Sequence, residues 1–294
     1  MGRTAPRWFL ALCLVGSLTL HPRELSAAAP VWTVRGAHGT VYLAGSIHLL
    51  PANDAQLPAA FGRAYSDCAV LVMELDLGKL DPQDLASWMQ QHGTLSSGTT
   101  LREVLGAPRY ARLAAAAAGL GAPMTLLDKQ APWLIGVELA ELEYGHLGYD
   151  PEQGVEEQLL RRAQADNKPT AGLETVDEEL GGLGRLPSAD QVKILDQTLS
   201  DLKDSEADMR VVLSAWKRGD APRLAALLSK EFREYPALYR PLVTDRNQHW
   251  LPQIGQFLQQ DRNTLVVVGA LHLVGRGGLL ELLRAAGYQP VQLD

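Results

Sequence analysis

Two segments of this chain repeat one pattern, one near each end of the sequence. VYLAGSIHLL (41–50) and LVVVGALHLV (265–274) are each an apolar run followed by Gly, a small residue, a branched apolar residue, His and Leu. Residues just past the carboxyl ends of strands form the ligand sites of open α/β sheets. We therefore predict that His48 and His272 share one functional site. The alternative is that both histidines satisfy buried carbonyls at tight turns.

Hydrophobic periodicity places strands and helices around these two loops. The predicted strands are 31–35, 40–44, 69–75, 169–173, 264–268 and 290–293. The predicted helices are 58–66, 82–92, 107–120, 132–144, 155–167, one from Ser188 that continues, broken, toward Trp216, one after Asp220, one through 246–258, and 279–286. This order predicts an α/β (α+β) fold, with a central sheet, flanking helices and two related units that bracket a helical middle.

Three local expectations accompany this fold. Ser188 and Gln191 have the spacing of a capping box at a helix start. The glycine of each Gly-x-x-His loop is expected to permit a sharp turn. The positive end of the following helix is expected to keep each histidine neutral, as metal binding or base chemistry requires.

The first residues have the features of an export signal. Arg3 and Arg7 precede the apolar run 8–20, and small residues follow at 26–29, which is typical of a signal peptide. We predict a signal over residues 1–28, a domain over 29–294 and a periplasmic location; an uncleaved membrane anchor is the alternative. Removal of three arginines and one glutamate moves the net charge from −7 to −9, since −7 − 3 + 1 = −9. Such an acidic chain disfavours nucleic acid as a partner.

Two glutamates stand where strands are predicted to end. Glu74 interrupts the apolar run VLVMELDL, where an unpaired carboxylate is costly to bury, and Glu174 follows a short strand. The alternatives are that Glu74, at a strand end, reaches solvent or pairs with an arginine, and that Glu174 is the acid of a helix start. Two histidines with one or two carboxylates suit Mn, Co or Zn. We predict His48, Glu74 and His272 as metal ligands and Glu174 as a further ligand or general base.

Other patterns either add to this site or are missing. Arg246 and Asn247, at a predicted helix start, are suited to clamp a carboxylate and polarise a carbonyl. Glu143 and His146 have the spacing of a di-iron motif, but it occurs once, and di-iron bundles need it on two helices. The sequence contains no HExxH, Gly-x-Ser-x-Gly, Walker or Rossmann pattern.

The order of these segments resembles the TraB/PrgY/GumN family. The similarity rests on GSIHLLP, VLVMELD, GYDPEQGVEEQLLRRA, NKPTAGLET, AWKRGD, DRNQHW and VVVGALHLVGRGGLLELLRAAGY, and it is greatest for the exported GumN-like branch. The resemblance implies a sheet with a two-fold strand repeat, and site positions at His48, Glu74, Glu174, Arg246, Asn247 and His272. The related Tiki proteins are described as Mn- or Co-dependent peptidases. Many relatives have Asp where this chain has Glu156, so we expect a shifted hydrogen-bonding or substrate-binding role there.

Three hypotheses about function follow from these residues. The first is a metal-dependent hydrolase of the cell envelope that acts on peptides, with Arg246 and Asn247 orienting the substrate. The second is a non-catalytic protein that binds or sequesters a peptide or glycan in the same cleft, gripped by aromatic side chains. The third is an envelope protein whose histidines are structural. The sequence does not indicate an oligomeric state.

Overall fold

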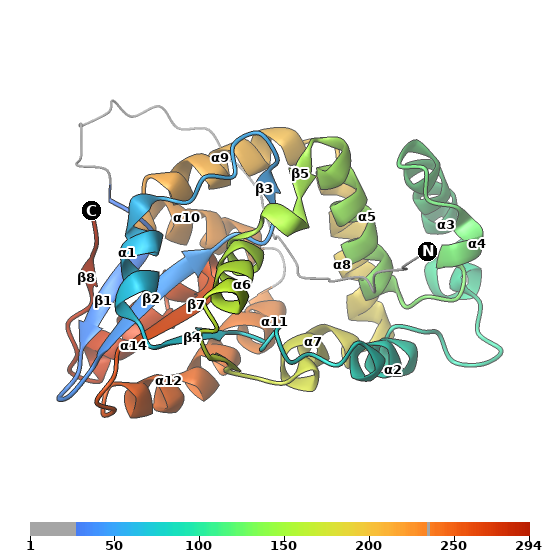
Figure 1. Cartoon of the computed structure of the whole chain (residues 1–294). Coiled ribbons are helices and arrows are strands. Elements are labelled where there is room, and N and C mark those ends of the chain that lie inside the picture. The colour runs from blue at the N-terminus through green and yellow to red at the C-terminus, as the bar shows by residue number, and fades with distance from the viewer. Residues whose placement is uncertain (1–27, 234–235) are drawn as a thin grey trace. The chain divides into compact units, whose positions relative to one another are not determined.

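The computed structural model describes residues 28–233 and 236–294 (Figure 1). The predicted signal peptide lies outside the described residues except for Ala28, so export stays a prediction. None of the helices in the described part is both long enough and apolar enough to cross a membrane. Contacts divide these residues into a helical unit, 80–149 and 176–206, and a sheet unit, 28–79, 150–175 and 207–294.

A six-stranded mixed sheet is the centre of the sheet unit, and it confirms the predicted fold class. Its strands are β1 (Val31–Arg35), β2 (Thr40–Ser46), β4 (Val70–Met73), β6 (Thr170–Gly172), β7 (Thr264–Gly269) and β8 (Val291–Gln292), in the spatial order β6-β4-β7-β2-β1-β8. The four strands β6, β4, β7 and β2 run parallel, whereas β1 is antiparallel to both of its neighbours. Strand β7 is buried over its first five residues, which explains its continuous apolar sequence.

Helices flank this sheet (Figure 1). They are α1 (Ala59–Asp67), α6 (Val155–Ala165), α9 (Ser205–Lys217), α10 (Ala221–Glu231), α11 (Pro236–Tyr239), α12 (Asp245–Phe257), α13 (Ala270–Leu273) and α14 (Leu279–Ala285), with a 3-10 turn η1 (Pro151–Gln153) and a π-helical turn η2 (Arg240–Thr244). Two further short strands are β3 (Leu50–Pro51) and β5 (Tyr149–Asp150). Asp220 begins α10 as predicted, because its Oδ1 accepts a hydrogen bond from the Arg223 amide at 3.0 Å.

The parallel strands bring the predicted site residues to one edge of the sheet. Each strand is followed within three residues by one of them: β2 by His48, β4 by Glu74, β6 by Glu174 and β7 by His272. Parallel neighbours share a direction, so all four carboxyl ends lie at the same edge. The topology therefore gathers side chains that are far apart in the sequence.

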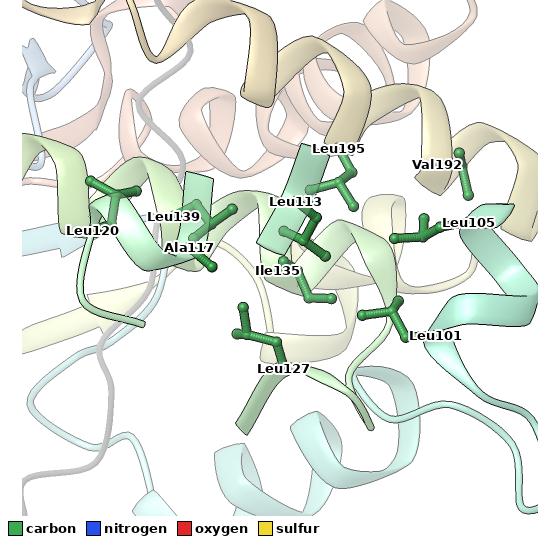
Figure 2. Packing of buried hydrophobic residues seen from close by; sticks show 10 residues of the cluster. All are labelled: Leu101, Leu105, Leu113, Ala117, Leu120, Leu127, Ile135, Leu139, Val192 and Leu195. Carbon is green, nitrogen blue, oxygen red and sulfur yellow. The ribbon is translucent and has the colours of Figure 1, made fainter. Parts of the chain in front are cut away.

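The helical unit has a core of its own. It contains α2 (Pro82–His92), α3 (Leu101–Gly119), α4 (Met124–Leu127), α5 (Pro132–His146), α7 (Val176–Gly184) and α8 (Ser188–Asp201). Figure 2 shows Leu113 and Ala117 of α3 facing Ile135 and Leu139 of α5, with Leu195 of α8 beside them. These side chains are at most 1% exposed. The predicted helical middle is thus a packed core of leucine, isoleucine and alanine.

Three local predictions are wrong in detail. Ser188 is the first helical residue of α8, its N-cap is Pro187, and no side chain caps it, so Ser188 and Gln191 form no capping box. Residues 270–273, expected as loop, form the short helix α13. Gly269 has an ordinary φ of −48°. The reason for glycine at that position is therefore not backbone freedom, and it becomes clear from the side chains around it.

Candidate functional site

Gly269, the last residue of β7, marks the centre of the candidate site. A Cβ atom at this position would lie 3.5 Å from Glu74 Oε1, 3.5 Å from His272 Cδ2 and 4.0 Å from His48 Nε2. The three predicted metal ligands thus surround one point, although they come from three different strand ends. A Cβ there would make ordinary van der Waals contacts, and a longer side chain would fill the space that these side chains share.

Glu74 is a buried carboxylate, 7% exposed, with a partner for each oxygen. The Gly269 amide donates to Oε1 at 2.7 Å, and Arg246 Nη2 donates to Oε2 at 2.5 Å. Burial alone would raise the pKa of Glu74, but Arg246, both histidines and the Gly269 amide lower this pKa to about 2. Glu74 is therefore ionised at any physiological pH.

Glu174 shares the same arginine. Arg246 Nε lies 3.1 Å and 3.2 Å from its two oxygens, Arg246 Nη2 also donates to Oε1, and Trp250 Nε1 donates to Oε2 at 3.1 Å. Burial raises the pKa of Glu174 to about 7; Arg246 opposes that increase and the charge of Glu74 adds to it. One guanidinium thus pairs with two buried carboxylates. Glu74 stays ionised, whereas the pKa of Glu174 lies near neutral pH, so Glu174 can gain and lose a proton there.

Arg246 lies at the start of α12 and connects the acidic side chains to a histidine. Its Nη1 is 3.3 Å from His272 Nε2, and its guanidinium carbon lies 4.9 Å from the centre of the Trp250 ring. Its side chain is 13% exposed, which is more than the 8% of Glu74 or the 1% of Glu174. Arg246 is thus the most accessible member of this ion-pair cluster.

Asn247 fixes the orientation and the tautomer of His272. Its Nδ2 donates to the carbonyls of His272 at 3.1 Å and Gly277 at 2.9 Å, so its Oδ1 accepts from His272 Nδ1 at 2.8 Å. His272 Nε2 faces the Arg246 donor and is therefore the unprotonated nitrogen. Burial and the Arg246 charge lower the pKa of His272 to about 3, which is the direction expected for a neutral ring, although the cause is burial and Arg246 rather than the following helix. Asn247 is fully buried and holds His272, whereas the sequence predicted that it contacts a substrate.

The residues 154–156 hold the other histidine loop at three points. The Val155 amide donates to Ile47 O at 3.1 Å, and a Cβ at Gly154 would lie only 2.3 Å from His48 O. Glu156 Oε1 lies 3.0 Å from His48 Nδ1, and Glu156 is 7% exposed. Nδ1 is therefore turned toward Glu156, while Nε2 is turned toward Gly269.

The surroundings of His48 shift its pKa in the direction opposite to the expected one. Burial lowers its pKa, but the charge of Glu156, its hydrogen bond and the charge of Glu74 outweigh burial and raise the pKa. Moreover, no helix starts at this loop, because α1 begins only at Ala59. The two matching sequences thus place their histidines in opposite electrostatic environments, one beside a carboxylate and one beside an amide.

The predicted site residues form one cluster. The Glu143 and His146 motif lies outside it. Glu74, Glu174, Arg246, Asn247 and His272 are linked by the hydrogen bonds above, and His48, with Glu156 beside it, faces the same point near Gly269. Glu143 belongs to the helical unit, where it accepts a hydrogen bond from Ser205 at 3.0 Å, and His146 is exposed. Trp250, the donor to Glu174, lies one helical turn after Arg246, and that spacing was the only signal of its role.

The donor chemistry fits a divalent cation. His272 Nε2 is unprotonated in its assigned tautomer, where its lone pair faces Arg246 Nη1 at 3.3 Å, Glu74 is ionised, and His48 Nε2 faces the point near Gly269. Among the described residues, the ligand atoms of His48, Glu74 and His272 do not all lie within 4.8 Å of one another, so an ion would have to draw them together. Glu74 already pairs with Arg246 Nη2 at 2.5 Å. A metal ion bound by Glu74 would therefore have to compete with this guanidinium.

Comparisons with known proteins agree with the sequence resemblance. The sequence profile of the TraB/PrgY/gumN family matches residues 30–292. "Uncharacterized protein YbaP" of Escherichia coli (strain K12) is 26% identical over 243 residues, which cover 83% of this chain and 87% of the relative. An "Uncharacterized protein" of Treponema pallidum (strain Nichols) is 24% identical over 296 residues, covering 94% and 86%. No solved structure matches the chain significantly.

Proposed function

Because this chain belongs to the TraB/PrgY/gumN family, and because its strand ends converge on one polar site, we propose that it is a divalent-metal-dependent hydrolase acting on peptides in the cell envelope. The observation that carries the proposal is the arrangement around Gly269. Two imidazoles and one ionised carboxylate, from segments up to 224 residues apart (272 − 48 = 224), face one position.

In this proposal His48, Glu74 and His272 hold Mn, Co or Zn. When bound, such an ion supplies Lewis acidity and lowers the pKa of a water molecule to about 7. The other residues of the cluster have roles that do not depend on the identity of the ion. Asn247 orients His272 through a hydrogen bond to Nδ1, and Glu156 lies as a charge partner 3.0 Å from Nδ1 of His48.

Glu174 and Arg246 are the residues proposed to act on the substrate. A pKa of about 7 lets Glu174 accept a proton from the attacking water and return it to the leaving amine near neutral pH. Arg246 donates to Glu174 and Glu74, and its side chain is the most exposed of the three. It is therefore suited to move toward a substrate carbonyl or carboxylate while Glu174 changes its charge.

One observation favours the second hypothesis, a binding protein without turnover. Arg246 already occupies the position beside Glu74 that a metal would need, and a partly exposed guanidinium can bind an anionic group of a peptide or glycan by itself. The aromatic side chains expected to grip the ligand in this second hypothesis are Trp88, Trp133, Trp216 and Tyr235, for which core packing is the alternative. Trp88, Trp133 and Trp216 are at most 9% exposed, and Tyr235 lies outside the described residues.

Metal titration separates these functions. Wild type should bind Mn, Co or Zn in isothermal calorimetry, and a His48→Ala/His272→Ala variant should not. His38→Ala is the matched control, because His38 is a histidine of the sheet unit whose side chain is 59% exposed, beside Asp261. Equally weak binding by wild type and the double variant would contradict the metal site.

Peptide cleavage is the second measurement. A mixed peptide library incubated with the Mn-loaded protein and read by mass spectrometry should show new termini. Glu174→Gln should abolish them while Mn affinity stays close to that of wild type, since Glu174 is proposed as base. Intact peptides that copurify with the protein would instead support sequestration.

A further inference from the structure

Ser46, the last residue of β2, has a buried hydroxyl that no contact explains. The residue is 3% exposed, and its Oγ is fully shielded from solvent. Among the described residues, no hydrogen-bond partner for this Oγ exists. Buried hydroxyls are nearly always paired, because an unpaired one loses its hydrogen bonds to water without replacement. The position therefore suggests a partner that is not part of the folded chain.

The strand register places Ser46 on the face of the sheet that carries the site. Ser46 is the direct partner of Gly269 in the parallel pair β2–β7. Paired residues of neighbouring strands project their side chains to the same face, about 5 Å apart. The side-chain direction of Gly269 leads to Glu74 Oε1 and His48 Nε2. Ser46 therefore projects beside the point on which the site converges.

The residue before Ser46 supports this direction. A Cβ at Gly45 would lie 3.0 Å from Ala270 Cα and 3.2 Å from a methyl group of Leu273. Gly45 thus faces α13, and successive residues of a strand alternate between faces. Ser46 therefore projects to the face opposite Ala270 and Leu273, the face on which the Glu74, His272 and His48 atoms near Gly269 lie.

We propose that Ser46 Oγ donates a hydrogen bond to the reacting oxygen of the bound substrate, the carbonyl oxygen that becomes negatively charged during hydrolysis. This inference rests on the proposed hydrolase function and assigns one more substrate contact to its site. A neutral donor that is already buried and unpaired gives up no existing bond when an oxyanion arrives. The need for a hydrogen-bond donor would thus explain a serine at this position, in addition to the small size of the Ser46 side chain.

A contrast between stability and binding tests this role. Ser46→Ala removes an unpaired hydroxyl, so the metal-free variant should melt at the same temperature as wild type or higher. Its Mn affinity should also be unchanged, because Ser46 is not among the proposed ligands. Acetohydroxamate, which presents an oxyanion to a protein-bound metal, should bind the Mn-loaded variant roughly 10- to 100-fold more weakly, as expected for a lost hydrogen bond to a charged group.

The chain offers a matched control in Thr264. This residue is also fully buried, its Oγ1 likewise has no partner among the described residues, and it lies at the start of β7. Five residues, or about 16 Å at ~3.3 Å per residue, separate it from Gly269. Thr264→Val should keep the hydroxamate affinity of wild type.

Each failure has a distinct meaning. A wild type that binds no Mn contradicts the proposed function and the role of Ser46 with it. If wild type binds Mn and hydroxamate but Ser46→Ala binds both equally well, the inference about Ser46 is overturned and the proposed function stands. A Ser46→Ala variant that is clearly less stable, or that loses Mn affinity, also overturns it, because the hydroxyl would then serve the fold or the ion.

Discussion

Replacing Arg246 by methionine removes the one cation that two buried carboxylates share. Burial raises the pKa of Glu74, and Arg246, both histidines and the Gly269 amide together lower it from 4.5 to about 2, with Arg246 the largest of these lowering effects. The net difference, 4.5 − 2 = 2.5, corresponds to about 3 kcal/mol at ~1.36 kcal/mol per pKa unit, and without Arg246 the opposing effect of burial remains. Methionine keeps much of the side-chain length without the charge. We therefore expect Arg246→Met to lower the free energy of unfolding at pH 7 by about 3 kcal/mol, similar to other buried pairs that lose one partner.

The pH dependence of this loss follows from the direction of the shift. A lowered pKa means that Glu74 contributes stability above pH 4.5 and loses it as the pH falls toward 2. The difference between wild type and Arg246→Met should therefore shrink between pH 7 and pH 4, when the carboxylate in the variant takes up a proton. Urea unfolding followed by circular dichroism at both pH values measures this.

Arg240→Met is the matched control for that experiment. Arg240 is 80% exposed and pairs with Asp245 at 3.0 Å, so its loss should cost under about 1 kcal/mol. The reasoning is refuted if Arg246→Met costs no more than this control, or if its cost is the same at both pH values. The same variant should bind Mn more tightly than wild type and cleave peptides more slowly, since a competitor for Glu74 and a substrate contact disappear together.

Three further expectations concern individual side chains. In an NMR titration, His48 should gain its proton above pH 6.5 and His272 only near pH 3; a shared titration midpoint would contradict their opposite environments. Asn247→Asp should raise the pKa of His272 in the same titration, because a carboxylate replaces the amide oxygen 2.8 Å from Nδ1. Cys68 is 5% exposed, and burial raises its pKa to about 12. A disulfide reagent at pH 8 should therefore leave Cys68 intact in the folded protein and modify it in urea. Rapid reaction in the folded protein would contradict this, because it would show that the thiol is accessible.

Much of the fold could be predicted from local sequence patterns. The hairpin, the buried strands and most helices follow from hydrophobic periodicity and from end signals such as Asp220, since burial on one face imposes that periodicity. The boundary errors have local physical causes. The helix predicted from residue 107 is the second part of α3, because Gly106, with φ of 73°, is not helical and separates it from a short first part that begins at Leu101 and was not predicted.

The sequence by itself determined which residues meet. The doubled Gly-x-x-His pattern and the acids at strand ends were enough to predict a site containing His48, Glu74 and His272, because parallel strands bring their carboxyl ends to one edge. Only the tertiary structure decided what each residue does there. It put an amide beside His272 and a carboxylate beside His48, divided one guanidinium between Glu74 and Glu174, and turned Ser46 toward Gly269. Charge and protonation depend on neighbours within a few ångströms, and those neighbours come from segments far away in the chain.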